Sequence, residues 1–512
     1  MMMEFSVASA LITFLLTIAL IQAIILISKR NKRTSSCYFN KLPPGPKPLP
    51  FLGHLLELGD KPHKSLANLA KIHGPLMTLK LGQITTIVIS SANLAKQVLL
   101  TLDPSFCNRN VVEAIQAREH HQVSVVWLPV GAPWRNLRKI CNSYIFSNQK
   151  LDSNQELRRK KIQDLVDQVE ASCRLGVAVD IGELAFKASL NVLSTSVFSL
   201  DLSDSKSDIV REFKEVVRCV MDEVGKPNLA DYFPILRKID PQRRKQRVDI
   251  QFGVLFEIFD RIIDKRLLLR KQPGYIPAND VLDTLLSLSE DDNSEGLDLD
   301  LNCIKHLFLD LFAAGTDTTS STLEWALTEL LKNPETLIKA QAEIGQTVGK
   351  GKLLQESDVA KLPYLQAVIK ETFRLYPAAP FLLPRKTVED VEIGGFIVPK
   401  DAQVLVNTWA IGRDSSLWVD AHLFSPERFL DSDIDARGRN FELIPFGAGR
   451  RICPGLPLAI RMLHLMLGSL INLFGWKLED ENNPNVMNME DRFGITLQKA
   501  HPLLAVPLKL QH

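Results

Sequence analysis

The sequence lacks the cysteine patterns that mark a disulfide-rich or zinc-binding protein. Its seven cysteines are odd in number, widely spaced and never form a C-x-x-C pair. This arrangement argues against a disulfide scaffold and a zinc site, and it is typical of a reducing compartment. N-x-S/T glycosylation sequons are absent as well, which is consistent with a chain whose body stays outside the secretory lumen.

A phosphate-binding glycine loop and an excess of one charge are also missing. Gly447 and Gly449 lack the third glycine of a dinucleotide fingerprint, so we expect no nicotinamide or flavin to bind there. The formal net charge of the 512 residues is only +2, which argues against a nucleic-acid partner. Hydrophobic residues make up 46% and charged residues 23% of the chain, as in an ordinary folded protein.

What the sequence does have, first of all, is a long apolar run at its start. Residues 5–28 contain no charged side chain, and about 20 apolar residues in a helix cross the hydrocarbon core of a bilayer. The basic cluster KRNKR follows at 29–33, whereas only Glu4 is charged before the run, so the positive-inside rule predicts a cytosolic body. The alternative is a cleaved signal peptide, but its apolar region is shorter and its basic residues precede that region.

We predict three segments along the chain. Residues 1–28 are a membrane anchor helix, residues 29–50 a basic and proline-rich hinge, and residues 51–512 a single domain. The hinge ends in LPPGPKPLP, whose five prolines fix the backbone in an extended form. No composition shift indicates a second boundary after the hinge.

Helical spacing of apolar residues dominates the rest of the chain and predicts a mainly α protein. The β-branched run ITTIVI at 84–89 predicts a strand, two short runs around Gly394 and Gly395 predict a hairpin, and residues 403–409 predict one more strand. We therefore expect a mainly α fold with small β-sheets.

One stretch, FGAGRRICPG at residues 446–455, surrounds a cysteine with three glycines, two arginines and a proline. Such a turn leaves backbone N–H groups to point at the sulfur of Cys453, and Arg450 and Arg451 bring positive charge. Both effects favour a thiolate, so we interpret Cys453 as the ligand of a haem iron. A free cysteine on a glycine-rich loop is the alternative.

Five positions in this stretch match the F-x-x-G-x-R-x-C-x-G haem signature of the cytochromes P-450: Phe446, Gly449, Arg451, Cys453 and Gly455. The chain resembles this family from end to end and is most similar to plant terpenoid hydroxylases of the geraniol 8-hydroxylase kind, in stretches such as AGTDTTSSTLEWA. The resemblance implies the cytochrome P-450 fold, mainly α with small β-sheets and preceded by one N-terminal transmembrane helix. It also implies haem b, with Cys453 as its thiolate ligand and Phe446 beside it.

The segment 302–333, which ends before Pro334, predicts a helix of about nine turns around the sequence AAGTDTTSST. Gly315 weakens a helix by about 1 kcal/mol relative to alanine, and threonine hydroxyls can bond the carbonyls four residues earlier, so we expect a kink or a widened turn. The residues alone also allow a kinked helix with a solvated aspartate. By resemblance to the family's A/G-G-x-D/E-T motif, Asp317 and Thr318 relay protons to oxygen at the iron.

Glu371 and Arg374 lie three residues apart in a predicted helix, and Arg428 follows in SPERF. From the residues alone this is equally an exposed ion pair, worth less than about 1 kcal/mol. The resemblance to the family's E-x-x-R and PERF motifs implies a buried network that holds the loop around Cys453. We assign these three residues a structural role.

A buried haem needs cations or N–H donors for its two propionates. Trp134 and Arg138 in WRNLRK match the W-x-x-x-R helix of the family, and Arg451 and Arg385 resemble the other propionate contacts. Taken singly, each arginine is also typical of a protein surface.

By resemblance, the substrate pocket is lined by Val111 to Val126, Phe312, Ala313, Phe381, Leu382, Leu383 and Ile495. These positions are mostly apolar, with His120 and His121 as exceptions, which predicts a hydrophobic substrate with few charges. Aliphatic stretches of this kind also occur in ordinary cores.

The implied activity is that of a monooxygenase that hydroxylates a terpenoid such as geraniol or a related monoterpene alcohol, or else a larger terpenoid or a phenolic compound. The resemblance also implies that electrons come from NADPH through a separate NADPH–cytochrome P-450 reductase, and that both proteins lie in the endoplasmic reticulum membrane. Arg135, Lys139 and Arg450 predict a basic docking patch for that acidic donor, although charged groups often only solvate a surface.

Two other function classes compete with this prediction. A family member that isomerises a peroxide needs no oxygen-activating acid and alcohol, so the presence of Asp317 and Thr318 argues against it. A membrane-anchored haem electron-transfer protein commonly fills both axial positions with side chains, and no partner ligand for Cys453 is evident in the sequence.

Overall fold

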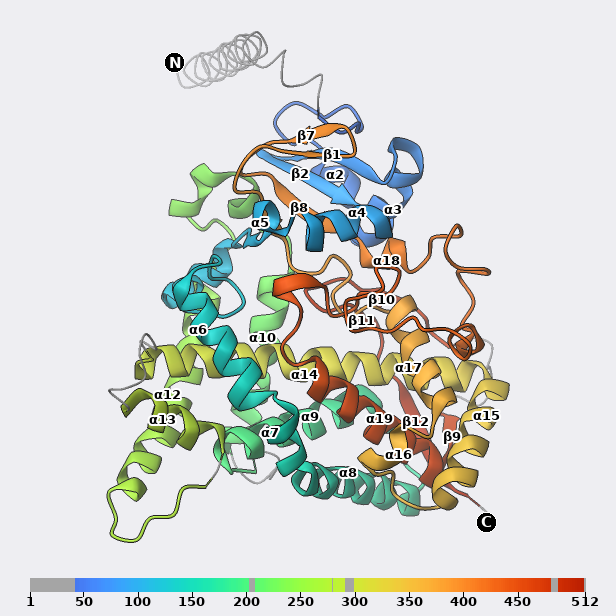
Figure 1. The fold of residues 1–512 in the computed structure, drawn as a ribbon. Helices are drawn as coiled ribbons and strands as arrows, with labels where there is room; N and C mark the ends of the chain where they lie inside the picture. Colours follow the sequence, from blue (N-terminus) through green and yellow to red (C-terminus); the bar gives the residue numbers. More distant parts are fainter. Residues whose placement is uncertain (1–41, 202–207, 279, 291–298, 480–486, 511–512) are drawn as a thin grey trace, which may run out of the picture.

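The longest described helix, α14 (Leu301–Lys332), crosses the middle of the molecule (Figure 1). It begins at Asp300, whose carboxylate accepts a hydrogen bond from the Cys303 N–H at 2.6 Å. Residues 304–312 of this helix pack into one hydrophobic core and residues 323–330 into a second. The small and polar stretch 313–322 therefore lies between two cores.

This computed structural model describes residues 42–201, 208–278, 280–290, 299–479 and 487–510. The predicted anchor at 1–28 and the basic part of the hinge lie outside the described residues. Among those described, α19 (Leu456–Leu473) is long and apolar enough to cross a membrane, but 61% of it is buried inside the protein, as in a core helix.

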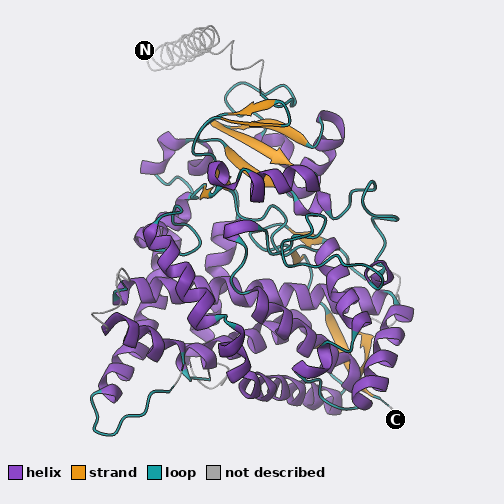
Figure 2. Ribbon diagram, in the orientation of Figure 1, coloured by secondary structure: helices purple, strands orange, loops and turns teal. Residues whose placement is uncertain are grey.

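Helices make up most of the fold (Figure 2). The longer ones besides α14 and α19 are α3 (Pro62–His73), α6 (Ala132–Ile140), α8 (Gln155–Leu175), α9 (Ile181–Phe198), α10 (Asp208–Gly225), α12 (Arg244–Arg270), α13 (Val281–Glu290), α15 (Pro334–Ile344) and α17 (Pro363–Leu375). The short ones are α2 (Leu55–Leu58), α4 (Ala92–Lys96), α5 (Asp103–Phe106), α7 (Asn148–Ser153), α11 (Leu229–Tyr232), α16 (Glu356–Val359) and α18 (Thr408–Ile411). Short 3-10 segments include η4 (Pro234–Lys238), η6 (Pro426–Phe429) and η7 (Gly449–Arg451), and the longer η2 (Glu113–Gln122) is two 3-10 pieces joined by a kink at residues 117–119.

The strands of the described residues form four small sheets. The largest has the order β1-β2-β8-β5-β3, in which only β2 and β8 run parallel. Its strands are β1 (Leu76–Leu81), β2 (Ile84–Ile89), β8 (Gln403–Val406), β5 (Arg385–Lys386) and β3 (Asn108–Arg109). The others pair β4 (Val179–Asp180), β12 (Leu504–Lys509) and β9 (Phe474–Leu478), then β6 (Val391–Ile393) with β7 (Phe396–Val398), and β10 (Asp491–Arg492) with β11 (Gln498–Lys499).

The predicted secondary structure is largely confirmed. The strand predicted at 84–89 is β2, and the predicted hairpin is β6–β7, which turns at Gly394 and Gly395 with φ of 58° and 79°, values that favour glycine. The strand predicted at 403–409 ends earlier, at Val406, because the Asn407 side chain accepts from the Ala410 N–H and starts α18.

The predicted widened turn in α14 is wrong, since the backbone is α-helical from Leu301 to Lys332. The threonine hydroxyls do bond backward as expected: Thr318 donates to the Ala314 carbonyl at 2.7 Å and Thr319 to that of Gly315 at 3.2 Å. Both hydroxyls thus find acceptors within a regular α-helix, and the turn does not have to widen by an extra residue.

Candidate functional site

The Cys453 loop is a tight turn that leads directly into α19. The Cys453 N–H donates to the Phe446 carbonyl at 2.9 Å, which closes the loop. Gly447 and Gly449 have φ of 71° and 69°, and a Cβ on Gly449 would lie 2.1 Å from the Leu99 carbonyl oxygen. Glycine is therefore required at Gly449 by both backbone conformation and space.

The electrostatics around the Cys453 sulfur differ in part from the prediction. Burial raises the pKa of the thiol, while hydrogen bonds from the backbone of Gly455 and Leu456 and the charge of Arg138 act in the opposite direction. The backbone donors are as predicted, because they open the N-terminus of α19. Neither of the predicted cations provides the charge: Arg450 pairs with Asp103, and Arg451 donates to backbone carbonyls.

Four buried or half-buried arginines gather near this loop: Arg109, Arg138, Arg385 and Arg451. Burial lowers the pKa of each of them. Repulsion from other members of the group adds to the shift at Arg109 and Arg451, and repulsion from Arg450 adds to it at Arg385. Among the described residues, the only carboxylate that pairs with the group is Asp103, which lies 3.0 Å from Arg385. The group therefore holds more positive charge than it matches.

Sequence reasoning missed one member of this arginine group. Arg109 lies in β3 opposite Arg385 of β5. Within the described ranges its guanidinium donates only to backbone carbonyls, those of Val126 at 3.3 Å and Leu383 at 2.8 Å. An isolated arginine in FCNRN matched no motif used in the prediction. Only the pairing of β3 with β5 brings Arg109 to the site.

Two other predicted haem contacts are engaged with the protein itself. The Trp134 indole N–H donates to the Val125 carbonyl at 3.1 Å, and the Arg451 guanidinium lies 4.6 Å from the centre of the Trp134 ring. Phe446 packs edge-on against Phe373 of α17, with ring centres 5.2 Å apart. These contacts position Arg451 and the Cys453 loop.

The middle of α14 combines a small residue with a buried acid. Ala314 is exposed although its helix crosses the molecular interior, and Thr318 lies one turn further on the same face. Asp317 is 4% exposed, and its Oδ1 accepts from the Gln498 side chain at 2.6 Å. Burial raises the pKa of Asp317. The two predicted relay residues are thus neighbours that point in different directions.

Glu371, Arg374 and Arg428 meet inside the protein, so the exposed-pair alternative is wrong. Arg374 Nε lies 2.7 Å and Arg428 Nε 3.1 Å from the Glu371 carboxylate, which is fully buried. Arg374 also donates to the carbonyls of Gly412, Ala421 and Leu423. The network directly fastens the segment 412–425, and it reaches the Cys453 loop only through neighbouring packing.

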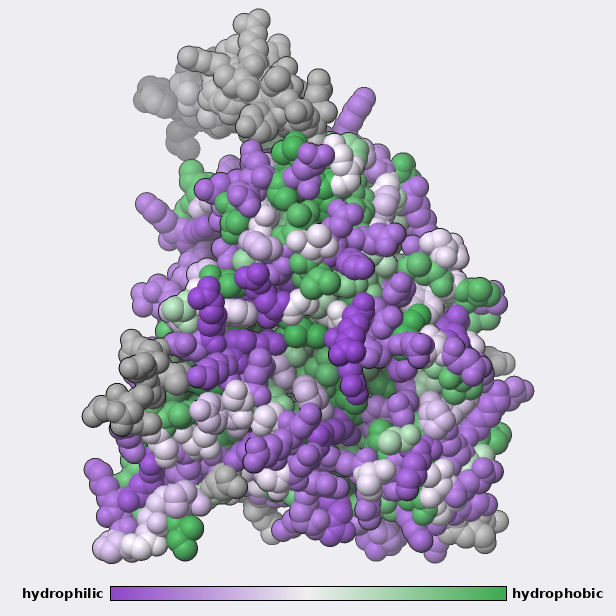
Figure 3. All heavy atoms as spheres, in the orientation of Figure 1, coloured by the Kyte–Doolittle hydropathy of each residue, from purple (hydrophilic) through white to green (hydrophobic). Residues whose placement is uncertain are grey.

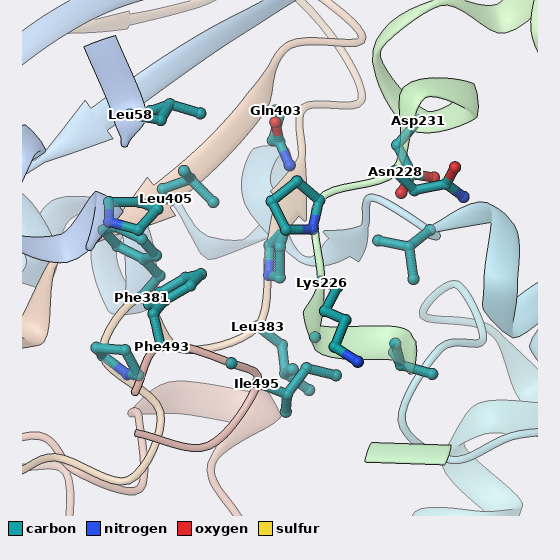
Figure 4. A pocket seen from close by; sticks show the side chains of 18 of the residues that line it. Leu58, Lys226, Asn228, Asp231, Phe381, Leu383, Gln403, Leu405, Phe493 and Ile495 are labelled. Atoms are coloured by element: carbon teal, nitrogen blue, oxygen red, sulfur yellow. The ribbon is translucent and has the colours of Figure 1, made fainter. Parts of the chain in front are cut away.

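A largely apolar pocket lies between α3, the end of α10, α11 and the strand β8 (Figure 4). Five of the predicted lining residues do line it: Val112, Phe381, Leu382, Leu383 and Ile495. Lys226, Asn228, Asp231 and Gln403 supply the polar groups. The Leu382 side chain would lie 3.7 Å from a Cβ on Gly447, so the pocket wall adjoins the Cys453 loop.

The other predicted lining residues are placed differently. Phe312 is fully buried and packs against Phe198 and Phe213, with ring centres 5.4 Å and 4.9 Å away, so it belongs to the core and lines no part of this pocket. Ala313 and Val126 are half-buried outside the pocket. The Val126 carbonyl accepts from Arg109 and Arg451.

The residues present fit a large, flat, dianionic group such as haem. The excess of guanidinium charge suits two carboxylates, and the sulfur of Cys453 lies near Arg138 of that group. Cys453, Arg109, Arg138 and Ala314 all keep accessible surface, although burial dominates the pKa shifts of the first three. They therefore face interior space.

Comparison with known proteins agrees with this geometry. The family profile of cytochrome P-450 matches residues 43–505. The chain is 53% identical over 508 residues to a geraniol 8-hydroxylase of Swertia mussotii, covering 99% of this chain and 100% of that protein. It is 54% identical over 500 residues to a geraniol 8-hydroxylase of Catharanthus roseus, with 98% and 99% covered.

A third relative has another substrate in its name. The chain is 51% identical over 480 residues to a drimenol monooxygenase of Persicaria hydropiper, with 94% of each protein covered. Matches of this length and identity reach far beyond the Cys453 loop. By its fold, its cysteine loop and these relatives, the chain belongs to the cytochrome P-450 family.

Proposed function

We propose that this protein is a haem-thiolate monooxygenase that hydroxylates a small terpenoid alcohol such as geraniol. The observation that carries the proposal is identity above half with two geraniol 8-hydroxylases over nearly the whole chain. The apolar pocket with few polar groups supports a hydrophobic substrate with a single polar function. When bound, a haem with a thiolate ligand supplies the reductive activation of O2, because the thiolate donates electron density that favours O–O cleavage.

The chain's own residues are proposed to hold the cofactor. Cys453 ligates the iron, and the N–H groups of Gly455 and Leu456 orient and partly neutralise its sulfur. Arg109, Arg138, Arg385 and Arg451 hold the propionates, with the last positioned by Trp134. Glu371, Arg374 and Arg428 keep the 412–425 segment in place.

Proton delivery is proposed for Asp317 and Thr318. The Thr318 hydroxyl donates to the Ala314 carbonyl. Its oxygen can therefore still accept a hydrogen bond from a water molecule or from a substrate hydroxyl. Burial raises the pKa of the Asp317 carboxyl, although hydrogen bonds from Thr496 and Gln498 act in the opposite direction. A rotation of the Asp317 side chain would bring a proton from the Gln498 side of α14 to Thr318.

A reductase is the proposed electron donor. Arg135 and Lys139 are exposed on α6, the helix that also carries Arg138, and Arg450 is 41% exposed in the cysteine loop. Positive charge close to the proposed haem suits an acidic flavoprotein surface such as that of NADPH–cytochrome P-450 reductase.

We propose that residues 1–28 anchor the protein in the endoplasmic reticulum membrane, with residues 29–50 as a hinge and residues 51–512 as one cytosolic domain. Exposed apolar side chains support membrane contact: Leu49, Phe51, Leu56, Ile235 and Ile239. They come from neighbouring segments, because the Gly82 N–H donates to the Leu52 carbonyl and the Gln83 N–H to that of Tyr232. Figure 3 shows hydrophobic residues at the surface at the top of the view, where Figure 1 places β1 and β2.

A binding screen tests the substrate class. The holoenzyme is titrated with acyclic monoterpene alcohols, larger terpenoids and flavonoids, and the type I shift of its Soret band is recorded. We expect the largest shift with an acyclic monoterpene alcohol, followed by a hydroxylated product when reductase and NADPH are added. If only larger terpenoids shift the band, or only phenolic compounds do, the compounds that bind are the substrate class and the proposed monoterpene alcohol is wrong.

A further inference from the structure

One wall of the pocket is made of aromatic rings and of the backbone that follows β10. Phe381 and Phe493 lie side by side on this wall (Figure 4), with ring centres 5.7 Å apart and planes at 66°. Gly494 and Ile495 continue the wall, and Pro62 and Leu66 of α3 close it. Pocket shape at this place therefore depends on how the segment 491–495 sits against α3.

His63, between the two α3 residues that line the pocket, supports Phe493 from behind. Its side chain is fully buried and lies parallel to the Phe493 ring, with centres 5.6 Å apart and planes at 12°. The Trp409 ring packs edge-on against the same imidazole at 5.2 Å. The His63 carbonyl accepts from the Asn407 side chain at 2.9 Å, so backbone and ring are both fixed.

Asp491 joins the same helix to the start of this segment. Its carboxylate is 5% exposed and accepts from His63 Nε2 at 3.3 Å and from Lys64 Nζ at 2.7 Å, with Lys61 Nζ at 3.5 Å. Burial by itself would raise the pKa of this carboxyl, but the hydrogen bonds from His63 and Lys64 and the charge of Lys64 outweigh it and hold the pKa well below its usual range. Asp491 is therefore charged at neutral pH and tied to α3.

The protonation of His63 follows from these contacts. Because Nε2 faces a carboxylate, Nε2 carries the proton, and Nδ1 is buried without a hydrogen-bond partner among the described residues. Burial lowers the pKa of His63, so the ring is a neutral, flat group. A neutral ring of this kind can stack on Phe493 while donating one directional bond to Asp491.

We infer that His63 and Asp491 form a clamp that positions Phe493 and the Gly494–Ile495 wall, and thereby sets how tightly and in which orientation the pocket holds its substrate. Both are positioning residues: neither lines the pocket, and each acts through a residue that does. The identity of the substrate rests on the proposed function, whereas the clamp itself does not. The sequence offered no signal for it, since His63 and Asp491 are 428 residues apart.

The test compares His63→Ala, His63→Phe and Asp491→Ala in the full-length holoenzyme. His63→Ala removes ring and bond, whereas His63→Phe keeps a ring behind Phe493. We expect His63→Ala to weaken terpenoid alcohol binding by about tenfold to a hundredfold, the range over which pocket shape discriminates, and to change the ratio of product regioisomers. His63→Phe should restore part of both. Lys71→Ala, at an exposed position of the same helix, is the matched control and should change neither.

A double-mutant cycle and hydrogen exchange make the test decisive. If the two residues act as one unit, the double variant His63→Ala/Asp491→Ala should be no worse than the more affected single variant. Amides in residues 491–499 should exchange faster in His63→Ala with no substrate present. Unchanged hydrogen exchange in His63→Ala would overturn the proposed clamp. So would a variant that gives less haem-loaded enzyme but binds substrate normally and keeps the normal product ratio. Faster exchange without binding of any terpenoid alcohol by the unaltered protein would instead overturn the proposed function alone.

Discussion

Arg374 and Arg428 each bond a carboxylate, that of Glu371, and we call them the matched group. Of Arg109, Arg138, Arg385 and Arg451, the unmatched group, Arg385 alone bonds a carboxylate in the described part of the chain, that of Asp103. In the first group the Glu371 carboxylate bonds both guanidiniums, and backbone carbonyls take the remaining donors of Arg374. In the second, Asp103 is divided between Arg385 and Arg450 of the cysteine loop.

We infer from this difference that the first group is a structural network and that the second is a binding site for an anion. An unmatched buried charge is costly, so a protein keeps several of them together only where something else balances them. The matched group needs no ligand, and its loss should unfold the surrounding segment. In the unmatched group, replacing one arginine should leave the stability of the ligand-free protein unchanged. The same replacement should weaken the binding of an anionic ligand.

The largest effect is expected from Glu371→Gln. The change leaves Arg374 buried without its countercharge, and breaking a buried pair in this way costs about 3–5 kcal/mol. Denaturant unfolding and the yield of haem-loaded protein both measure it. Glu156→Gln is the matched control, because Glu156 and Arg159 have the same i,i+3 spacing on an exposed surface, and it should change neither. If both variants lower the unfolding free energy and the haem-loaded yield equally, the buried pair is no more important for stability than the exposed one.

Asp103→Asn should come next. Removing the one carboxylate increases the excess charge, which should destabilise the haem-free protein by about 1–3 kcal/mol and leave haem retention much less affected. Thermal unfolding with and without haem gives the two values. A variant that loses haem faster without losing stability would show that Asp103 does not balance the arginine group.

Arg138→Met should act with the opposite sign. Arg138 donates no hydrogen bond within the described part of the chain, so an apolar replacement of similar length removes repulsion at little cost. We expect the haem-free protein to be as stable as before or more stable, while haem is lost about tenfold faster, the effect of about one charge-assisted hydrogen bond. The rate of haem transfer to a scavenger protein measures this. A destabilised haem-free protein would mean that the cluster is already balanced.

Thr318→Ala should have the smallest effect on stability, less than about 1 kcal/mol, because the lost bond only returns to the helix's own carbonyl. Thr318 contacts neither arginine group, so this variant is a control for the effects expected at both groups. Substrate binding should persist while product formed per NADPH falls and peroxide rises. Normal coupling in this variant would exclude Thr318 from proton delivery.

The site could be predicted wherever a short stretch carries its own chemistry. The Cys453 loop and its turn into α19 follow from glycine and backbone geometry, and Glu371 and Arg374 share one helix. β2 and the β6–β7 hairpin follow from local patterns as well. In each case the residues that interact are close in sequence.

Long-range contacts account for the rest. Arg109 joins the arginine group only because β3 pairs with β5. Phe312 is apolar and next to the small residues of α14, yet the aromatic rings of Phe198 and Phe213 take it into the core. Arg450, predicted to stand beside the sulfur, is drawn away by Asp103. Partner choices of this kind depend on packing between distant segments, which one sequence does not reveal.

The central claim is that Cys453 ligates a haem iron within the unmatched arginine group. The direct measurement is the carbon monoxide difference spectrum of the reduced protein and of Cys453→Ser, with folding checked by circular dichroism. We expect the red-shifted Soret band of a thiolate-ligated haem in the unaltered protein and its disappearance in the folded variant. An identical band in both proteins would contradict it.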